Sequence, residues 1–82
     1  MFKWRRSTIE FIIWMYDTKK VTKSECPFFG FYLHVWHLRD MGLVKENGLN
    51  DKNQKIWELT PLGREIAKKF KEIEEMMING KE

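Results

Sequence analysis

Two short segments constrain the fold of this chain more than any other feature: residues 38–44 (LRDMGLV) and residues 60–65 (TPLGRE). The first segment predicts that a helix of residues 31–41 ends at Gly42, because glycine suits the left-handed conformation that follows many helices. Leu43-Val44 then begins a strand with no intervening loop. This part of the chain therefore predicts a helix joined directly to a strand.

The second segment predicts the reverse junction, a strand joined directly to a helix. Ile56–Leu59 places Trp57 and Leu59 on one face at the two-residue period of a strand. Thr60 is suited to cap the following helix, and Pro61 to its first position, where no backbone N–H is needed. The polar residues between the strands predict a hairpin whose turn is formed either by Asn47-Gly48 or by residues 50–53.

The N-terminal part predicts a helix from Thr8 to Asp17, opened by a capping box between Ser7 and Glu10. Residues 19–21 can add a very short strand. The helix is apolar on two faces, so both faces must be covered. One face carries Ile9, Ile12, Ile13 and Tyr16, and the other carries Phe11, Trp14 and Met15.

A second capping box at Thr22–Glu25 opens another helix, which Pro27 and Gly30 must keep short. At the other end of the chain, Pro61–Asn79 predicts a helix roughly 28 Å long. This is longer than the core of an 82-residue domain can cover. Its apolar stripe consists of Leu62, Ile66, Phe70, Ile73 and Met77.

Composition limits the kinds of function to consider. Residues 1–82 fit one domain, and the net charge of +3 comes from residues 1–30, which hold six Lys/Arg and three Asp/Glu. We find no apolar run long enough to span a bilayer and no signal peptide, so we expect a cytoplasmic protein without a membrane partner. No catalytic motif is present, and we expect neither enzymatic activity nor a cofactor. His34, His37 and Cys26 lack a fourth ligand for zinc, so we also expect no metal.

The order helix, strand, hairpin turn, strand, helix resembles the winged helix-turn-helix transcriptional regulators of the MarR, PadR and ArsR kind. The residues that carry this resemblance are Leu38, Gly42-Leu43-Val44 and Leu59-Thr60-Pro61-Leu62-Gly63. It implies an α+β, mainly α fold with three N-terminal helices, a two- or three-stranded β-wing and a long C-terminal helix. It also implies a homodimer that binds double-stranded DNA and regulates transcription, with the helix of residues 31–41 as the reader. Because residues 22–42 are short for two helices and a turn, the helix before the reader must be abbreviated.

The expected reading helix has an unusual outward face. If Phe31, Val35 and Leu38 face the core, then Leu33 and Trp36 point outward, where direct base recognition favours polar side chains. One hypothesis is that this face contacts DNA, with apolar groups against thymine methyls. Another is that protein covers it, either a second subunit or the N-terminal Phe2 and Trp4, which would make the chain a protein–protein interaction module. A third is that the helical phase is wrong by one residue.

The candidate DNA contacts combine this helix with cations near the second helix and on the hairpin, where lysines can meet phosphates. They are Lys20, Lys23, Ser24, Tyr32, Leu33, Trp36, His37, Arg39, Lys45, Lys52, Asn53 and Lys55. A long C-terminal helix and an N-terminal helix with two apolar faces also favour a homodimer. Its candidate interface residues are Phe11, Trp14, Met15, Phe70, Ile73 and Met77.

Overall fold

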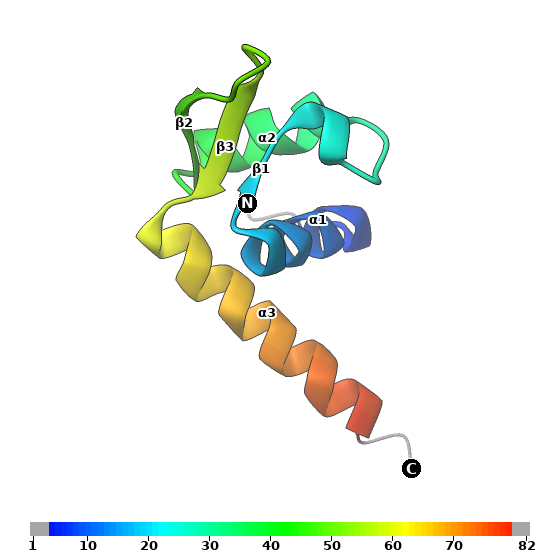
Figure 1. Cartoon of the computed structure of the whole chain (residues 1–82). Coiled ribbons are helices and arrows are strands. Elements are labelled where there is room, and N and C mark those ends of the chain that lie inside the picture. The colour runs from blue at the N-terminus through cyan, green and yellow to red at the C-terminus, as the bar shows by residue number, and fades with distance from the viewer. Residues whose placement is uncertain (1–3, 80–82) are drawn as a thin grey trace.

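The computed structural model describes residues 4–79 and contains helices packed on a three-stranded antiparallel sheet (Figure 1). The fold is α+β and mainly helical, as predicted. In the view of Figure 1, α2 lies behind the sheet, and α3 passes α1 and extends beyond the other elements. The elements are α1 (Arg6–Thr18), β1 (Lys20–Val21), the 3-10 helix η1 (Lys23–Glu25), α2 (Phe31–Asp40), β2 (Val44–Leu49), β3 (Lys55–Leu59) and α3 (Pro61–Asn79).

Helix α1 begins two residues earlier than predicted. Arg5 occupies its cap position and makes no side-chain hydrogen bond there. Ser7 is already the second residue of the helix, so the predicted capping box between Ser7 and Glu10 is wrong. Glu10 instead lies near Arg6, with 3.9 Å between carboxylate and guanidinium. This exposed pair adds little stability, and burial must hold the helix in place.

Both apolar faces of α1 pack inside the chain. Phe11, Ile12 and Met15 are fully buried. The Phe11 ring centroid lies 5.6 Å from that of Phe31 and 6.0 Å from that of Phe28. The assignment of Phe11 and Met15 to a dimer interface is therefore wrong. Phe28 and Phe31, which follow β1 in the sequence, cover Phe11. The sequence interpretation had assigned this role to a second chain.

The sheet has the order β1-β3-β2, so β3 is the central strand. Val21 of β1 pairs with Trp57, and Val44 of β2 pairs with Leu59. All four side chains are buried and form the sheet's contribution to the core. The short strand expected near residues 19–21 is confirmed, and its pairing with β3 ties the N-terminal half of the chain to the hairpin.

The second predicted helix is reduced to the three residues of η1. Its capping box is confirmed, because the Glu25 carboxylate accepts the backbone N–H of Thr22 at 3.0 Å. Cys26 then adopts an extended conformation with φ −73° and ψ 124°. The residue before a proline is disfavoured in a helix, so Pro27 ends η1 here. The second of the three expected N-terminal helices was predicted to be abbreviated, and the structure reduces it to a single 3-10 helix between the α-helices α1 and α2.

Helix α2 ends as the sequence predicts. The N–H of Leu43 donates to the carbonyl of Leu38 at 2.9 Å, and the N–H of Gly42 donates to that of Arg39 at 2.9 Å. These two bonds form the Schellman arrangement, which requires a left-handed residue. Gly42 provides it with φ 76°. Leu38 and Leu43 are both buried, so the helix end is also fixed by apolar contact.

The two segments that constrain the fold meet in one place, which we call the junction: Gly42, Leu43, Thr60 and Gly63. The Thr60 hydroxyl donates to the carbonyl of Gly42 at 2.8 Å and accepts the N–H of Gly63 at 3.1 Å. The N–H of Thr60 donates to the carbonyl of Leu43 at 2.9 Å. A Cβ atom on Gly63 would lie 2.1 Å from the Leu43 oxygen, so only glycine permits this approach. The junction joins α2, the sheet and α3.

The first half of α3 packs against the rest of the chain. Ala67 is fully buried, and the Phe70 ring lies 4.8 Å from the ring of Trp4. Lys71 donates a hydrogen bond to the Asp17 carboxylate at the end of α1. This hydrogen bond raises the pKa of Lys71 above its ordinary value. The second half of α3 continues past α1 (Figure 1).

Candidate nucleic-acid interface

The outward face of α2 is apolar, as the sequence predicts. Phe31, Val35 and Leu38 are buried, which confirms the helical phase. Leu33 and Trp36 are 73% and 49% exposed. The hypothesis that the phase is wrong by one residue is therefore excluded.

One hypothesis was that the N-terminal Phe2 and Trp4 cover this apolar face. Trp4 packs instead against Phe70 of α3. Phe2 lies outside the described residues. Phe29, which precedes α2, is also apolar and is 100% exposed. Within residues 4–79, this surface is open to solvent.

Three side chains from η1 and α2 form what we call the aromatic strip: Lys23, Tyr32 and Trp36. The Lys23 ammonium lies 5.5 Å from the centroid of the Tyr32 ring, a cation–π distance. The rings of Tyr32 and Trp36 lie 5.5 Å apart with 31° between their planes. The strip therefore joins η1 to the exposed face of α2 and places a positive charge beside two aromatic rings.

A hydrogen bond joins η1 to the β2–β3 hairpin. The Ser24 hydroxyl donates to the Gln54 side chain at 3.4 Å, and it also lies 3.1 Å from the hydroxyl of Thr22. Because η1 has only three residues, it lacks the aligned N–H groups of a longer helix, and any phosphate contact near η1 depends on its side chains. The two segments enclose a cleft of about 410 Å³, the hairpin cleft, lined by Lys20, Thr22, Ser24, Glu25, Asn50, Asp51, Lys52, Gln54 and Ile56.

Asn50 organises the hairpin tip. Its side-chain oxygen accepts the backbone N–H groups of Lys52 and Gln54, each at 2.9 Å. Asn53 adopts φ 60°, which asparagine tolerates better than most residues. Of the two predicted turns, the one at residues 50–53 is confirmed, whereas Asn47-Gly48 lies within β2. Lys52 and Asn53 are both exposed at the tip, as the sequence interpretation requires.

The other two hairpin lysines are paired with carboxylates. Lys45 lies 3.5 Å from Glu58, and Lys55 lies 3.8 Å from Glu46. Sequence reasoning missed both pairs because each joins opposite strands whose register it had not specified. Exposed pairs of this kind contribute little stability and can rearrange. Their net charge is nevertheless neutral, so Lys45 and Lys55 are weaker candidates for phosphate contact than Lys52.

The remaining polar candidates lie on α2. His37 and Arg39 are exposed, whereas His34 stacks on Phe11 with 5.0 Å between ring centroids. Burial, followed by the nearby His37, lowers the pKa of His34 below its ordinary value. The Cys26 sulfur lies 3.3 Å from the backbone nitrogen of Phe28 and serves the local turn. Within residues 4–79, no three His, Cys, Asp or Glu side chains gather where they could hold a metal.

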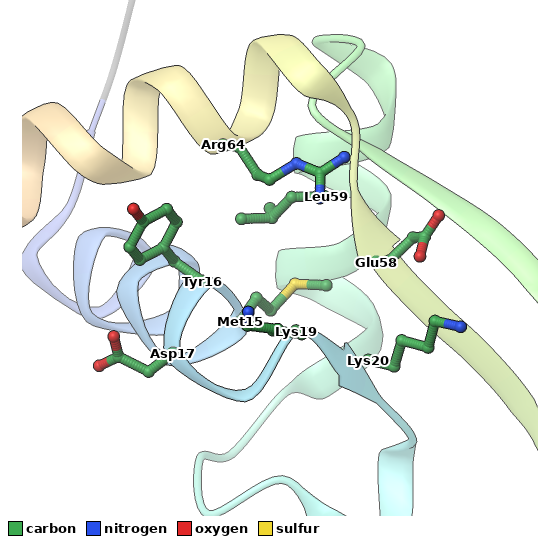
Figure 2. Close-up of a pocket in the computed structure, with 8 residues that line it drawn as sticks. All are labelled: Met15, Tyr16, Asp17, Lys19, Lys20, Glu58, Leu59 and Arg64. Atoms are coloured by element: carbon green, nitrogen blue, oxygen red, sulfur yellow. The ribbon is translucent and has the colours of Figure 1, made fainter.

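Sequence reasoning missed a second cationic region, which we call the basic cleft (Figure 2). It has a volume of about 450 Å³ and lies between α1, β1, β3 and α3. Among the described residues, Lys19, Lys20 and Arg64 have no carboxylate within ion-pair distance, whereas the two carboxylates of the cleft are held by lysines outside it. Lys20 borders both clefts. The lining residues are Met15, Tyr16, Asp17, Lys19, Lys20, Glu58, Leu59 and Arg64.

The remaining candidate dimer residues fall into two groups. Trp14 is half-buried and packs its ring 5.5 Å from Phe11, and Phe70 is half-buried beside Trp4. Ile73 and Met77 are exposed on the part of α3 that extends beyond α1. Only these last two offer an open apolar surface.

Comparison of the chain with protein-family models, curated proteins and solved structures finds no match. Between residues 4 and 79, none of the helices combines the length and the apolar character needed to cross a membrane.

Proposed function

We propose that this chain binds duplex DNA in a winged-helix arrangement, with α2 as the reading helix and the β2–β3 hairpin as the wing. The aromatic strip carries this proposal. It places the Lys23 ammonium 5.5 Å from Tyr32, next to the exposed Trp36. A cation can contact phosphate while apolar rings contact thymine methyl groups in the major groove. The function would be that of a transcriptional regulator.

Four cations supply the phosphate contacts in this proposal: Lys20, Lys23, Arg39 and Lys52. None of them has a carboxylate partner among the described residues. Four phosphate contacts give a slope of roughly −3.6 for the logarithm of the binding constant against the logarithm of salt concentration. Affinity should therefore fall roughly 150-fold between about 50 and 200 mM salt.

Fluorescence anisotropy with a labelled duplex tests this. Lys23→Gln should weaken binding and reduce the magnitude of the salt slope by about one. Lys68→Gln is the matched control, because Lys68 is exposed on α3 and lies outside the proposed contact face. An unchanged slope in Lys23→Gln, or the absence of duplex binding by the wild type at low salt, would refute the proposal.

A second candidate function rests on a different observation, the exposure of Phe29, Leu33 and Trp36. Large apolar side chains left open to solvent often mark a protein contact. In that case the winged-helix fold would serve as a protein–protein interaction module, and α2 would bind protein. Salt separates the two functions, because an apolar protein contact lacks the steep salt dependence of phosphate binding.

A further inference from the structure

The basic cleft has the size and part of the lining of a small-molecule site. Its volume of about 450 Å³ lies within the roughly 300–1,000 Å³ that such sites usually have. Met15 and Leu59 are buried and supply apolar surface, and the half-buried Tyr16 adds an aromatic ring. The cleft therefore offers an apolar lining to the organic part of a ligand.

Three cations from different elements line the same cleft. Lys19 follows the last residue of α1, Lys20 opens β1, and Arg64 lies in the first turn of α3. Figure 2 shows the Arg64 side chain extending from α3 toward Leu59. None of the three cations has a carboxylate within ion-pair distance among residues 4–79. Their charge is therefore available to an anion.

The two carboxylates of the cleft are occupied by donors from outside it. Asp17 accepts a hydrogen bond from Lys71, and in Figure 2 its carboxylate points away from Arg64. Glu58 lies 3.5 Å from Lys45 and accepts the side-chain amide of Asn47 at 3.0 Å. The lining consequently has an excess of positive charge, which attracts anions into a cleft.

The backbone of Lys19 is strained. Its φ of 78° and ψ of −67° correspond to the classic γ-turn, a rare conformation. Among residues 4–79, the other non-glycine residue with positive φ is Asn53, of a type that tolerates this region. Glycine would relieve the strain at position 19. Strain of this kind is often stored at functional sites, which indicates that the lysine side chain itself is used.

We infer that the basic cleft binds a phosphate monoester of a small organic molecule. Such a group carries a charge of about −1.5 to −2 at neutral pH, so it balances most of the three positive charges. The Arg64 guanidinium can bind two phosphate oxygens at once, and the lysines act as point charges. A carboxylate, or one phosphodiester of DNA, carries a single charge and leaves two cations unbalanced. The organic group lies against Met15, Tyr16 and Leu59.

Isothermal titration calorimetry of the full chain with three probes tests the inference. Phenyl phosphate should bind with a Kd below about 1 mM. Phenyl sulfate has the same shape but one negative charge, and it should bind roughly tenfold more weakly. Inorganic phosphate lacks the ring and should also bind more weakly than phenyl phosphate. Absence of phenyl phosphate binding would overturn the inference, and so would equal affinity for either of the other two probes.

Two variants assign the binding to this cleft. Lys19→Gly and Arg64→Gln should each weaken phenyl phosphate binding at least about tenfold. Both positions are exposed, and glycine relieves the strain at position 19, so both variants should fold, which circular dichroism checks. Lys68→Gln is the matched control, because Lys68 is exposed on α3 and does not line the cleft. It should retain the affinity of the wild type.

Unchanged affinity in Lys19→Gly or Arg64→Gln would overturn the inference, as would an equal loss in Lys68→Gln. A chain that does not bind phenyl phosphate, but whose Arg64→Gln variant binds duplex DNA more weakly, would assign the cleft to the DNA backbone and also overturn it. The titrations with the three probes contain no DNA, so their failure is distinct from failure of the proposed function.

Discussion

Replacing Gly63 with alanine should destabilise the protein, although general helix propensity predicts the opposite. Alanine inside a helix is favoured over glycine by about 1 kcal/mol. In this structure, however, the added Cβ would lie 2.1 Å from the carbonyl oxygen of Leu43 and 3.0 Å from its carbonyl carbon. Because both atoms belong to the backbone, which cannot rotate aside like a side chain, α3 must move away from Leu43, the residue that precedes β2.

The size of the effect follows from the contacts that this movement disrupts. The Leu43 oxygen accepts the N–H of Thr60, and the Thr60 hydroxyl caps α3 through Gly63. Loss of the hydrogen bond costs about 1 kcal/mol and loss of the cap about another 1 kcal/mol. Steric strain adds roughly 1–3 kcal/mol. After subtracting the gain in propensity, we expect a net loss of about 3 kcal/mol, or roughly 12–24 °C in Tm.

Urea denaturation followed by circular dichroism measures this loss. Gly42 provides the matched comparison, because it has φ 76° but no atom within 4 Å of the place that a Cβ would occupy. Gly42→Asn should be tolerated, since asparagine accepts the left-handed region. Gly63→Asn should be at least as damaging as Gly63→Ala. If Gly63→Ala were as stable as the wild type, the close approach at the junction would be refuted.

Two further predictions concern α2. Trp36→Ala should weaken duplex binding about tenfold, equivalent to roughly 1.4 kcal/mol. It should leave the sedimentation coefficient unchanged. If the variant instead sedimented as a smaller species than the wild type, Trp36 would belong to a contact between subunits. The pKa of His34 is lowered in the folded chain, so the unfolded chain binds its proton more readily and stability should fall as pH decreases below the ordinary pKa of 6.5. In thermal unfolding, His34→Gln should lose less stability at acid pH than the wild type does. His37→Gln, a change at an exposed position, should still lose most of the stability that the wild type loses.

The sequence predicted the elements whose ends are fixed by local chemistry. Gly42 and Thr60 act within a few residues of themselves, so their roles as helix end and helix cap could be inferred without the fold. The position of Pro27 likewise predicted a short second helix. Ser7 shows the limit of such local inference. Its capping pattern predicted a helix start at Thr8, but the helix begins at Arg6, because burial of the apolar side chains also decides where a helix starts.

The parts that depend on contacts between distant residues could not be predicted. Covering Phe11 requires the segment of residues 28–31 to fold back on α1, which no periodicity reveals. Lys19 and Arg64 both line the basic cleft, and they do so only because α1, β1 and α3 pack together. The pairing of Lys45 with Glu58 depends on strand register. For the DNA candidates, the outward face of α2 was predictable, but the neutralisation of the hairpin lysines was not.

The junction has an evolutionary consequence. Thr60 and Gly63 act together at the start of α3. The Thr60 hydroxyl bonds the carbonyl of Gly42, and the missing side chain of Gly63 lets the helix begin close to Leu43. A lineage that replaced Gly63 would lose the reason to keep a hydroxyl at position 60, because the helix start would have shifted. We therefore expect these two positions to change together in divergent chains, and the spacing Thr-x-x-Gly after a strand to identify relatives whose remaining sequence has diverged.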